Sequence, residues 1–332
     1  MTNRMKTHSP KVNEIGWPWT EASIPDEQEL DDPANAPAIA LPMPSYNQDR
    51  FLDAAIRSVL LQNYPNLEFV VRDGGSTDES VDIIKSYEDK LTDWVSQPDG
   101  GQSAAINAVW DDASGELLGW LNSDDILAPG ALHTLARAAR DHPDVVLFFG
   151  DYGIIDEDGR LDRVRKVGDL GAEDLLRGKS FGQPSVFIRR EVVENLGLLD
   201  ESMTYSMDWA YFLKVLWSYP SSRIRYIPSV LSCSREYEGT KSRTGLEDKG
   251  EDRRGAIRRY ADAGIIPNRD ALVQKGLAGT YWVQGAEEFL AGQYVDAFRS
   301  GLNAIRLHPA SLLEKIPRLI WLFRTRVERA SE

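Results

Sequence analysis

The chain has 332 residues, of which 42% are apolar and 27% charged, and its formal net charge is −14. This composition is typical of a folded globular protein and not of a disordered one. The negative charge, together with the lack of a basic stripe, excludes a nucleic acid partner, and the single Cys233 excludes an internal disulfide framework.

Targeting signals are not evident in the sequence. The N-terminal residues 1–16 lack the apolar core of a secretory signal, and no stretch reaches the roughly 18 apolar residues of a spanning helix. We therefore expect a cytoplasmic chain.

Residues 1–36 are predicted to form an irregular arm, because they combine four prolines with the acidic run DEQELDD. Trp17 and Trp19 are expected to pin this arm onto the body, since large aromatic side chains are usually buried.

From residue 38 to about 150, apolar runs alternate with segments of helical spacing. The predicted strands are 39–45, 67–73, 93–98, 116–122 and 144–150, and the predicted helices are 48–62, 78–88, 102–113 and 129–142. Such alternation predicts a mostly parallel sheet covered by helices on both faces. Ligands bind at the carboxyl ends of the strands in sheets of this kind.

Beyond residue 150 the pattern is looser. Residues 151–167 predict a hairpin that turns at Glu157-Asp158-Gly159, residues 207–219 a helix, and residues 223–235 a strand. From about 246 the chain reads as helical. We accordingly expect a catalytic domain over 37–245 and a helical extension over 246–332.

Two adjacent carboxylates, Asp124 and Asp125, follow a predicted buried strand, and Asp73 follows another. Like charges side by side are costly unless a cation or hydrogen-bond donors hold them. A divalent cation bridging to substrate phosphates would do so. The alternative is that the pair only caps the helix that begins near Pro129.

Seven motifs in a fixed order give this arrangement a family resemblance over about residues 38–240. They are PSYN (44–47), RDGGSTD (72–78), QPDGGQSAAIN (97–107), WLNSDDILAPGAL (120–132), QPSVFIRR (183–190), LGLLDE (196–201) and MDWAYFLK (207–214). Together they resemble the inverting family 2 glycosyltransferases, which have the GT-A fold, a Rossmann-like α/β architecture.

The resemblance implies a nucleotide site. Pro44 and Tyr46 match residues that shape the base pocket, and Asp73 matches the acid that accepts a hydrogen bond from the base. The segment over the ribose and diphosphate is matched by Asp99, Gly101 and Asn107.

The resemblance also implies a Mn²⁺ or Mg²⁺ site and a general base. Asp124 matches the last acid of the family's DxD metal motif, with Asp125 behind it, and Asn122 and Ser123 take the first two places. Asp208 matches the catalytic base; its alternative role is to cap the helix that begins before Trp209.

Three departures from the family pattern lower the local negative charge or remove a ligand. Gly74 and Asn122 stand where relatives often have acids, and SREYEGTKSRTG (234–245) lacks the late histidine of many members. The cations of that segment, Arg235, Lys241 and Arg243, are candidates for diphosphate or acceptor contacts. Gln183 and Trp209, from two of the motifs above, are further candidates. The alternative for the cations is a solvated loop.

The C-terminal part divides into two predicted segments. Residues 279–309 resemble one tetratricopeptide-like helix pair, expected to pack on the catalytic domain because a solenoid needs about three repeats. Residues 306–332 carry six Lys and Arg against three Glu around an apolar centre at 319–323, so 312–332 either contacts an anionic membrane peripherally or docks as a terminal helix.

The leading hypothesis is therefore metal-assisted, inverting transfer from a nucleoside diphosphate sugar, with a UDP-sugar as the expected donor, to a glycan or lipid-linked acceptor. Two alternatives stay open. One is a non-catalytic relative that binds sugar nucleotides, and the other is a glycoside hydrolase with Asp124 and Asp208 as paired carboxylates.

Overall fold

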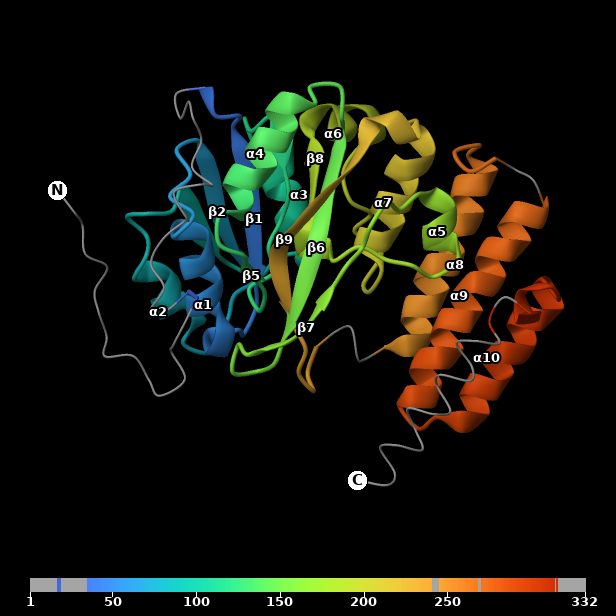
Figure 1. Ribbon diagram of the computed structural model, residues 1–332. Helices are drawn as coiled ribbons and strands as arrows, with labels where there is room; N and C mark the ends of the chain where they lie inside the picture. Colours follow the sequence, from blue (N-terminus) through green and yellow to red (C-terminus); the bar gives the residue numbers. More distant parts are fainter. Residues whose placement is uncertain (1–16, 19–34, 241–244, 268–269, 314, 316–332) are drawn as a thin grey trace. The chain divides into compact units, whose positions relative to one another are not determined.

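A computed structural model describes residues 17–18, 35–240, 245–267, 270–313 and 315 (Figure 1). The chain divides into two units, each described here by itself. The first lies within Met1–Asp169, Phe181–Leu199 and Ser222–Tyr237, and the second within Leu170–Ser180, Asp200–Ser221 and Glu238–Glu332. The helical unit thus takes two segments from the range predicted for the catalytic domain, 170–180 and 200–221.

The first unit is built on one sheet. Its nine strands are β1 (Ile39–Ser45), β2 (Leu67–Asp73), β3 (Asp93–Ser96), β4 (Leu117–Leu118), β5 (Ile126–Leu127), β6 (Leu147–Ile155), β7 (Leu161–Arg165), β8 (Val186–Arg189) and β9 (Ile224–Arg235). The order is β3-β2-β1-β4-β8-β6-β9-β5, with β7 paired to β6.

The first four strands in this order are parallel, as the alternation predicts, but β8 runs antiparallel to both β4 and β6. The sheet is therefore mixed. The antiparallel strands β7 and β8 come from the region beyond residue 150, where the regular alternation of strand and helix stops, while the two-residue β5 pairs antiparallel with β9. The predicted hairpin is confirmed as β6 and β7, with Gly159 at φ +81° in the turn.

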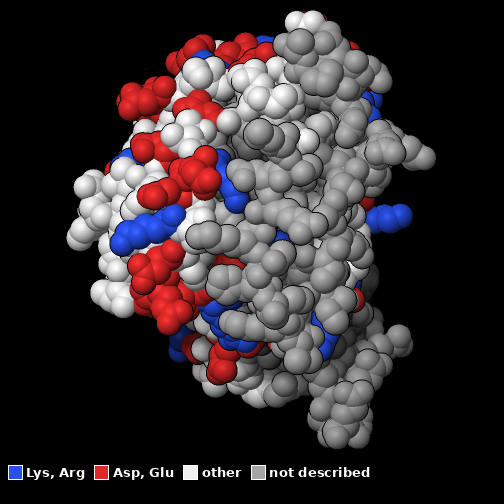
Figure 2. Space-filling view, turned by 90° about the vertical axis from the view of Figure 1, so that its left-hand side faces the viewer, with Lys and Arg blue, Asp and Glu red and all other residues white. Residues whose placement is uncertain are grey.

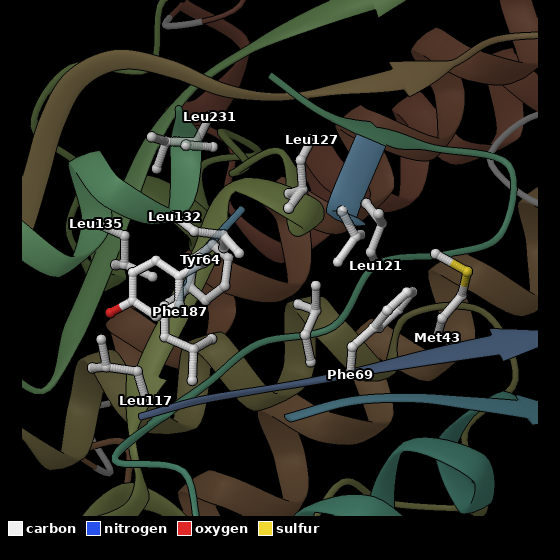
Figure 3. Packing of buried hydrophobic residues seen from close by; sticks show 14 of the residues in the cluster. Met43, Tyr64, Phe69, Leu117, Leu121, Leu127, Leu132, Leu135, Phe187 and Leu231 are labelled. Atoms are coloured by element: carbon white, nitrogen blue, oxygen red, sulfur yellow. The ribbon is translucent and has the colours of Figure 1, made fainter. Parts of the chain in front are cut away.

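Helices cover both faces of this sheet. They are α1 (Asp49–Leu60), α2 (Ser80–Lys85), α3 (Gln102–Asp112), α4 (Ala131–Asp141) and α6 (Arg190–Leu196), with a 3-10 turn η3 (Gln183–Ser185). In Figure 1, α1 and α4 lie in front of the sheet and α3 behind it. The core under α1 and α4 includes Phe69, Leu132, Leu135 and Phe187, which point toward one another in Figure 3. Each such buried side chain contributes about 1.5–3 kcal/mol.

The register brings the ends of three strands to one level. Ser45 at the end of β1 pairs with Asp73 at the end of β2, and Asp73 pairs with Ser96 at the end of β3. The loops that follow these strands therefore leave the sheet at the same edge, where the sequence predicts the ligand site.

The N-terminal arm is anchored where it is described. The Trp17 indole N–H donates to the Leu127 carbonyl at 2.8 Å, and Trp17 packs against Ala54, Ile126 and Ile155. The prediction that Trp17 pins the arm is confirmed, whereas Trp19 lies outside the described residues.

Acidic side chains are abundant on the face of the first unit seen in Figure 2, consistent with the net charge of −14.

The second unit is helical. It contains α5 (Ala172–Leu176), α7 (Met207–Ser218), α8 (Leu246–Asp262), α9 (Asp270–Leu290) and α10 (Tyr294–Leu307), and a 3-10 turn η4 (Ser221–Arg223) leads into β9. A Cβ on Gly279 would lie 1.9 Å from the Leu176 carbonyl oxygen, so glycine is needed where α9 meets the end of α5. The predicted helix pair forms as α9 and α10; its tetratricopeptide likeness stays a prediction.

None of the described helices has the length and apolarity to cross a bilayer. The basic tail lies almost entirely outside the described residues, since 314 and 316–332 are not described. Its predicted membrane contact and the docked alternative both stay predictions.

Candidate active site

The loop after β2 is held together by Asp73. This residue is 2% exposed, and its Oδ2 accepts hydrogen bonds from the N–H groups of Gly75 and Ser76 and from the Ser96 hydroxyl, while its Oδ1 accepts from the Ser76 hydroxyl. These four hydrogen bonds hold the loop in shape. The predicted contact of Asp73 with the base stays a prediction.

The exits of β1, β2 and β3 meet at Gly74. A Cβ placed on Gly74 would lie 3.4 Å both from the Tyr46 ring and from Asp99 Oδ1. Tyr46 is 60% exposed, so its ring is available for stacking, whereas Pro44 before it is buried in β1. Tyr46 and Asp99, predicted to serve one nucleotide, thus lie in one cluster.

The start of α3 completes this part of the site. Asp99 Oδ1 accepts the N–H of Gly101 at 2.7 Å, and Gly101 takes φ +96°, a region that favours glycine. Asn107, further along α3, is 4% exposed, and its amide exchanges two 3.0 Å hydrogen bonds with the main chain of Leu199. Its side chain tethers the 196–199 segment, and its predicted place over the ribose stays a prediction.

Asn122 lies in a network of amides in the acid loop, defined as residues 122–125. Its Oδ1 accepts from the Gln102 amide at 2.7 Å, and its Nδ2 donates to Gln183 Oε1 at 3.1 Å and to Asp125 Oδ2 at 3.3 Å. Gln183 in turn donates to the Trp120 carbonyl at 2.9 Å. This network fixes the acid loop relative to α3 and η3, and Ser123 is buried within the loop.

The two adjacent carboxylates have different environments. Asp125 is 6% exposed, and its Oδ1 accepts the Arg235 N–H at 2.9 Å. Burial raises the pKa of the Asp125 carboxyl well above its usual range, and the charge of Asp124 adds to the effect. Asp124 is partly exposed, and its Oδ2 accepts the Tyr237 hydroxyl at 3.2 Å. Of the two carboxylates, Asp124 is the one that solvent reaches more readily.

Arg235 is engaged inside the protein. Its guanidinium donates to the carbonyls of Asp124, Asp156 and Glu157 at 2.9–3.1 Å and lies 4.6 Å from the centre of the Phe51 ring. Arg235 is 6% exposed, so the predicted diphosphate contact and the solvated-loop alternative are both at odds with its burial. Lys241 and Arg243 lie outside the described residues.

The acid loop suits a divalent cation that also has ligands from a bound molecule. Among the residues that the structure describes, no three His, Cys, Asp or Glu side chains cluster as a metal site. The partly exposed Asp124 carboxylate would supply one oxygen, and Mg²⁺ or Mn²⁺ commonly takes the rest from phosphates and water. Asp125, whose oxygens face Arg235 and Asn122, fits direct coordination less well.

The predicted base belongs to the second unit. Asp208 lies in the first turn of α7, where Ser206 is the N-cap and the Asp252 carboxylate accepts the N–H groups of Tyr205 and Ser206 at 3.0 and 3.3 Å. Burial raises the pKa of Asp208, while the Trp209 N–H and the cations Arg253 and Lys249 oppose this. Trp209 is 4% exposed with Arg253 over its ring, so it supports α7 from within.

Two members of the site were missed in the sequence. Gln102 belongs to the motif QPDGGQSAAIN, but a polar residue at the start of a helix can have several roles, so its hydrogen bond to Asn122 was not predicted. Tyr237 follows β9, and only its fold-dependent contact with Asp124, 113 positions away, marks it. The sequence offered one signal for Tyr237, which is its position two residues after a strand that ends beside the site.

The strand ends of this α/β sheet gather an exposed tyrosine, a helix that opens at a glycine, and the acid loop, and in sheets of this kind ligands usually bind at that edge. Residues 42–203 match the family described as Glycosyl transferase family 2. An uncharacterized glycosyltransferase of Haemophilus influenzae is 32% identical over 187 residues, which cover 55% of this chain and 73% of the relative. The chain belongs to glycosyl transferase family 2, and with it to the glycosyltransferases.

Other relatives share less of their length. An uncharacterized glycosyltransferase of Rickettsia felis is 30% identical over 219 residues, 62% of this chain but only 35% of the relative. The GalNAc(5)-diNAcBac-PP-undecaprenol beta-1,3-glucosyltransferase of Campylobacter jejuni is 27% identical over 173 residues, 48% of this chain and 54% of the relative.

Solved structures share the fold. S. aureus TarS 1-349 in complex with UDP-GlcNAc gives a TM-score of 0.62 at 18% identity and covers 81% of this chain and 79% of its own. The mannosyltransferase PcManGT from Pyrobaculum calidifontis, in complex with GDP-Man and Mn²⁺, gives 0.54 at 18% identity with 88% and 85% covered. The fold is accordingly GT-A.

Proposed function

We propose that this protein transfers a sugar from a nucleoside diphosphate sugar to a glycan or lipid-linked acceptor, with inversion at the anomeric carbon. The observation that carries the proposal is the partly exposed Asp124 carboxylate beside the edge where β1, β2 and β3 end in register. Family membership supports the reaction class, and the cluster of Tyr46 and Asp99, with the acid loop fixed to the start of α3, supports a donor site there.

The donor's base is assigned to Tyr46, whose exposed ring stands beside Gly74 and Asp99. The segment that begins α3 at Gly101 is assigned to the ribose and diphosphate. The relatives' structures with UDP-GlcNAc and with GDP-Man support a nucleoside diphosphate donor. A UDP-sugar is proposed, with GDP-sugars as the comparison in the test.

A bound Mn²⁺ or Mg²⁺ would stabilise the charge that develops on the departing diphosphate. Asp124 is proposed as its carboxylate ligand. Asp125 and Asn122 hold the acid loop in shape, and Gln102 and Gln183 fix Asn122 from α3 and η3. The relative solved with GDP-Man and Mn²⁺ supports this use of a metal.

Asp208 is proposed as the general base. Its carboxylate would accept the proton of the acceptor hydroxyl as that oxygen attacks the anomeric carbon on the face opposite the diphosphate. A single displacement of this kind inverts the configuration. The raised pKa of Asp208 strengthens it as a proton acceptor, and the Trp209 N–H and nearby cations keep its charged form accessible.

The acceptor is proposed from the relative of Campylobacter jejuni, whose name specifies an undecaprenol-linked glycan. A role in polysaccharide biosynthesis follows from that likeness. Gln183 is the candidate acceptor-side contact that lies at the acid loop.

Two alternatives are distinguished by simple measurements. A relative that binds sugar nucleotides without catalysis would bind donor but show no transfer. A glycoside hydrolase using Asp124 and Asp208 would cleave glycosides and gain nothing from a nucleotide.

The test is thermal stabilisation of the full chain by UDP- and GDP-sugars, each with and without Mn²⁺. A donor at 100 times its dissociation constant adds about 2.7 kcal/mol to the unfolding free energy. We expect stabilisation by one donor class, larger with Mn²⁺, and loss of the Mn²⁺ increment in Asp124→Asn. Asp82→Asn, a change at an exposed position of α2, is the matched control. No stabilisation by any donor would refute the proposal.

A further inference from the structure

Tyr237 contacts the acid loop from the opposite end of the first unit's sequence. It lies two residues after the end of β9 at Arg235, and its hydroxyl donates to Asp124 Oδ2 at 3.2 Å. The Gln48 amide donates to the same hydroxyl oxygen at 3.5 Å. Since the oxygen accepts from Gln48, the hydroxyl hydrogen is directed at the carboxylate.

The ring of Tyr237 packs against Phe51, which is itself held by Arg235. Its centre lies 4.9 Å from that of Phe51, which is 5% exposed in α1. The Arg235 guanidinium lies 4.6 Å from the Phe51 ring and is itself tied to three main-chain carbonyls. A tyrosine has few rotatable bonds, so a fixed ring also fixes the direction of its hydroxyl.

Asp125 and Asp124 are thus oriented by different means. Asp125 is held by a main-chain N–H of Arg235 and by Asn122. Asp124 is partly exposed, and its Oδ2 accepts the hydroxyl of a side chain, Tyr237. A hydrogen bond to one carboxylate oxygen orients the other, and bonds to charged acceptors are the stronger kind.

We propose that Tyr237 is a positioning residue that orients the Asp124 carboxylate toward a bound divalent cation and diphosphate. The inference rests on the proposed function, because it concerns the carboxylate assigned to that complex. Partners that orient metal ligands typically change metal affinity by about 10–100-fold when removed.

The experiment measures Mn²⁺ affinity of the full chain by titration calorimetry at saturating UDP or GDP, whichever binds more tightly. The affinity for that nucleotide without metal is measured beside it. Tyr237→Phe keeps the ring against Phe51 and removes only the hydroxyl. We expect Mn²⁺ to bind about 10–100-fold more weakly to this variant, while the metal-free nucleotide affinity and the melting temperature stay at the wild-type values.

Tyr226→Phe is the matched control, because Tyr226 also donates to a carboxylate, Asp151 Oδ1 at 2.7 Å, but away from the acid loop. Its Mn²⁺ affinity should equal that of the wild type. Adding Tyr237→Phe to Asp124→Asn should weaken Mn²⁺ no further, since the tyrosine acts through Asp124.

The outcomes separate the two proposals. If the wild type gains Mn²⁺ affinity with nucleotide and Tyr237→Phe matches it, the role of Tyr237 is refuted while the proposed function stands. An equal loss in Tyr237→Phe and Tyr226→Phe, or a further loss in the double variant, also refutes it. If the wild type binds neither nucleotide, the proposed function and this inference both fail.

Discussion

The acids of the two units have opposite surroundings. In the acid loop of the first unit, Asp124 and Asp125 are adjacent, and the pKa of Asp125 is raised by burial and then by the charge of its neighbour. In the second unit, Asp208 is the acidic residue in the first turn of α7, and the positive charges of Arg253 and Lys249 act on it. Burial raises its pKa too, but the nearby charges act in the other direction.

This difference matches two kinds of chemistry. Adjacent carboxylates with one partly exposed member concentrate negative charge, which favours a cation. A single carboxylate of raised pKa, kept ionisable by a helix start and two cations, favours proton transfer. The predictions that follow test whether the two units really divide the work in this way.

The largest effect is expected in the second unit. Asp208→Asn removes the proton acceptor while keeping size and the helix start, so turnover should fall by roughly 10²–10⁴-fold, the usual contribution of a positioned general base. Donor affinity should be unchanged, because the donor is assigned to the first unit. Initial rates with the donor found in the stabilisation screen, and a binding titration, measure the two quantities.

Asp296→Asn is the control for this substitution, since Asp296 is exposed on α10 and forms a surface ion pair with Arg299. Its turnover should match the wild type. If donor binding falls together with turnover in Asp208→Asn, the division between the two units is wrong.

Much of the first unit was predictable from sequence, because its strands and helices are encoded by the spacing of neighbouring residues. The parallel strands β1 to β3 and their helices follow from hydrophobic spacing, and the resemblance placed PSYN, RDGGSTD and the acid loop at strand ends. The sequence did not predict the internal hydrogen bonds of Asp73, Asn107 and Arg235. Each of these polar residues is buried with all or most of its hydrogen bonds satisfied inside the protein, and a motif does not reveal which partner a side chain has.

The boundary between the units was also beyond the sequence. Residues 170–180 and 200–221 join the helical unit although their motifs belong to the family region. Which unit a segment belongs to depends on packing between residues far apart in the sequence, such as the contact of α9 with the end of α5 at Gly279. The local spacing of apolar residues does not reveal such contacts.

The second prediction concerns stability within the acid loop. Asp125→Ala leaves the Arg235 N–H and the Asn122 amide without their acceptor, so the unfolding free energy should fall by about 1–3 kcal/mol. Asp124→Ala should cost less than about 1 kcal/mol, because its carboxylate is partly exposed. Urea denaturation of both variants compares them, and an equal or reversed ranking would contradict the structural assignment of Asp125.

The smallest expected effect is a pH dependence that belongs to Asp208. Because its folded-state pKa is raised, the folded chain keeps this proton to a higher pH than the unfolded chain does. The associated stability is fully present below the unfolded pKa and is lost as pH rises through the folded pKa, and Asp208→Asn should remove that loss.

The pH dependence of activity should also be set by the ionisation of Asp208. Activity should rise with pH, whereas the stability contribution of Asp208 falls. The base works only when ionised, so kcat/KM should fall by at most about tenfold per pH unit as pH drops through the raised pKa. That acid limb should lie above the range of an ordinary aspartate. It should be absent from the residual rate of Asp208→Asn and unchanged in Asp296→Asn. The difference between wild type and Asp208→Asn, in rate and in unfolding free energy across pH, isolates Asp208 from Asp125, whose raised pKa is common to both proteins. If the acid limb persists in Asp208→Asn, Asp208 is not the titrating group, and the proton transfer would then be assigned to the first unit.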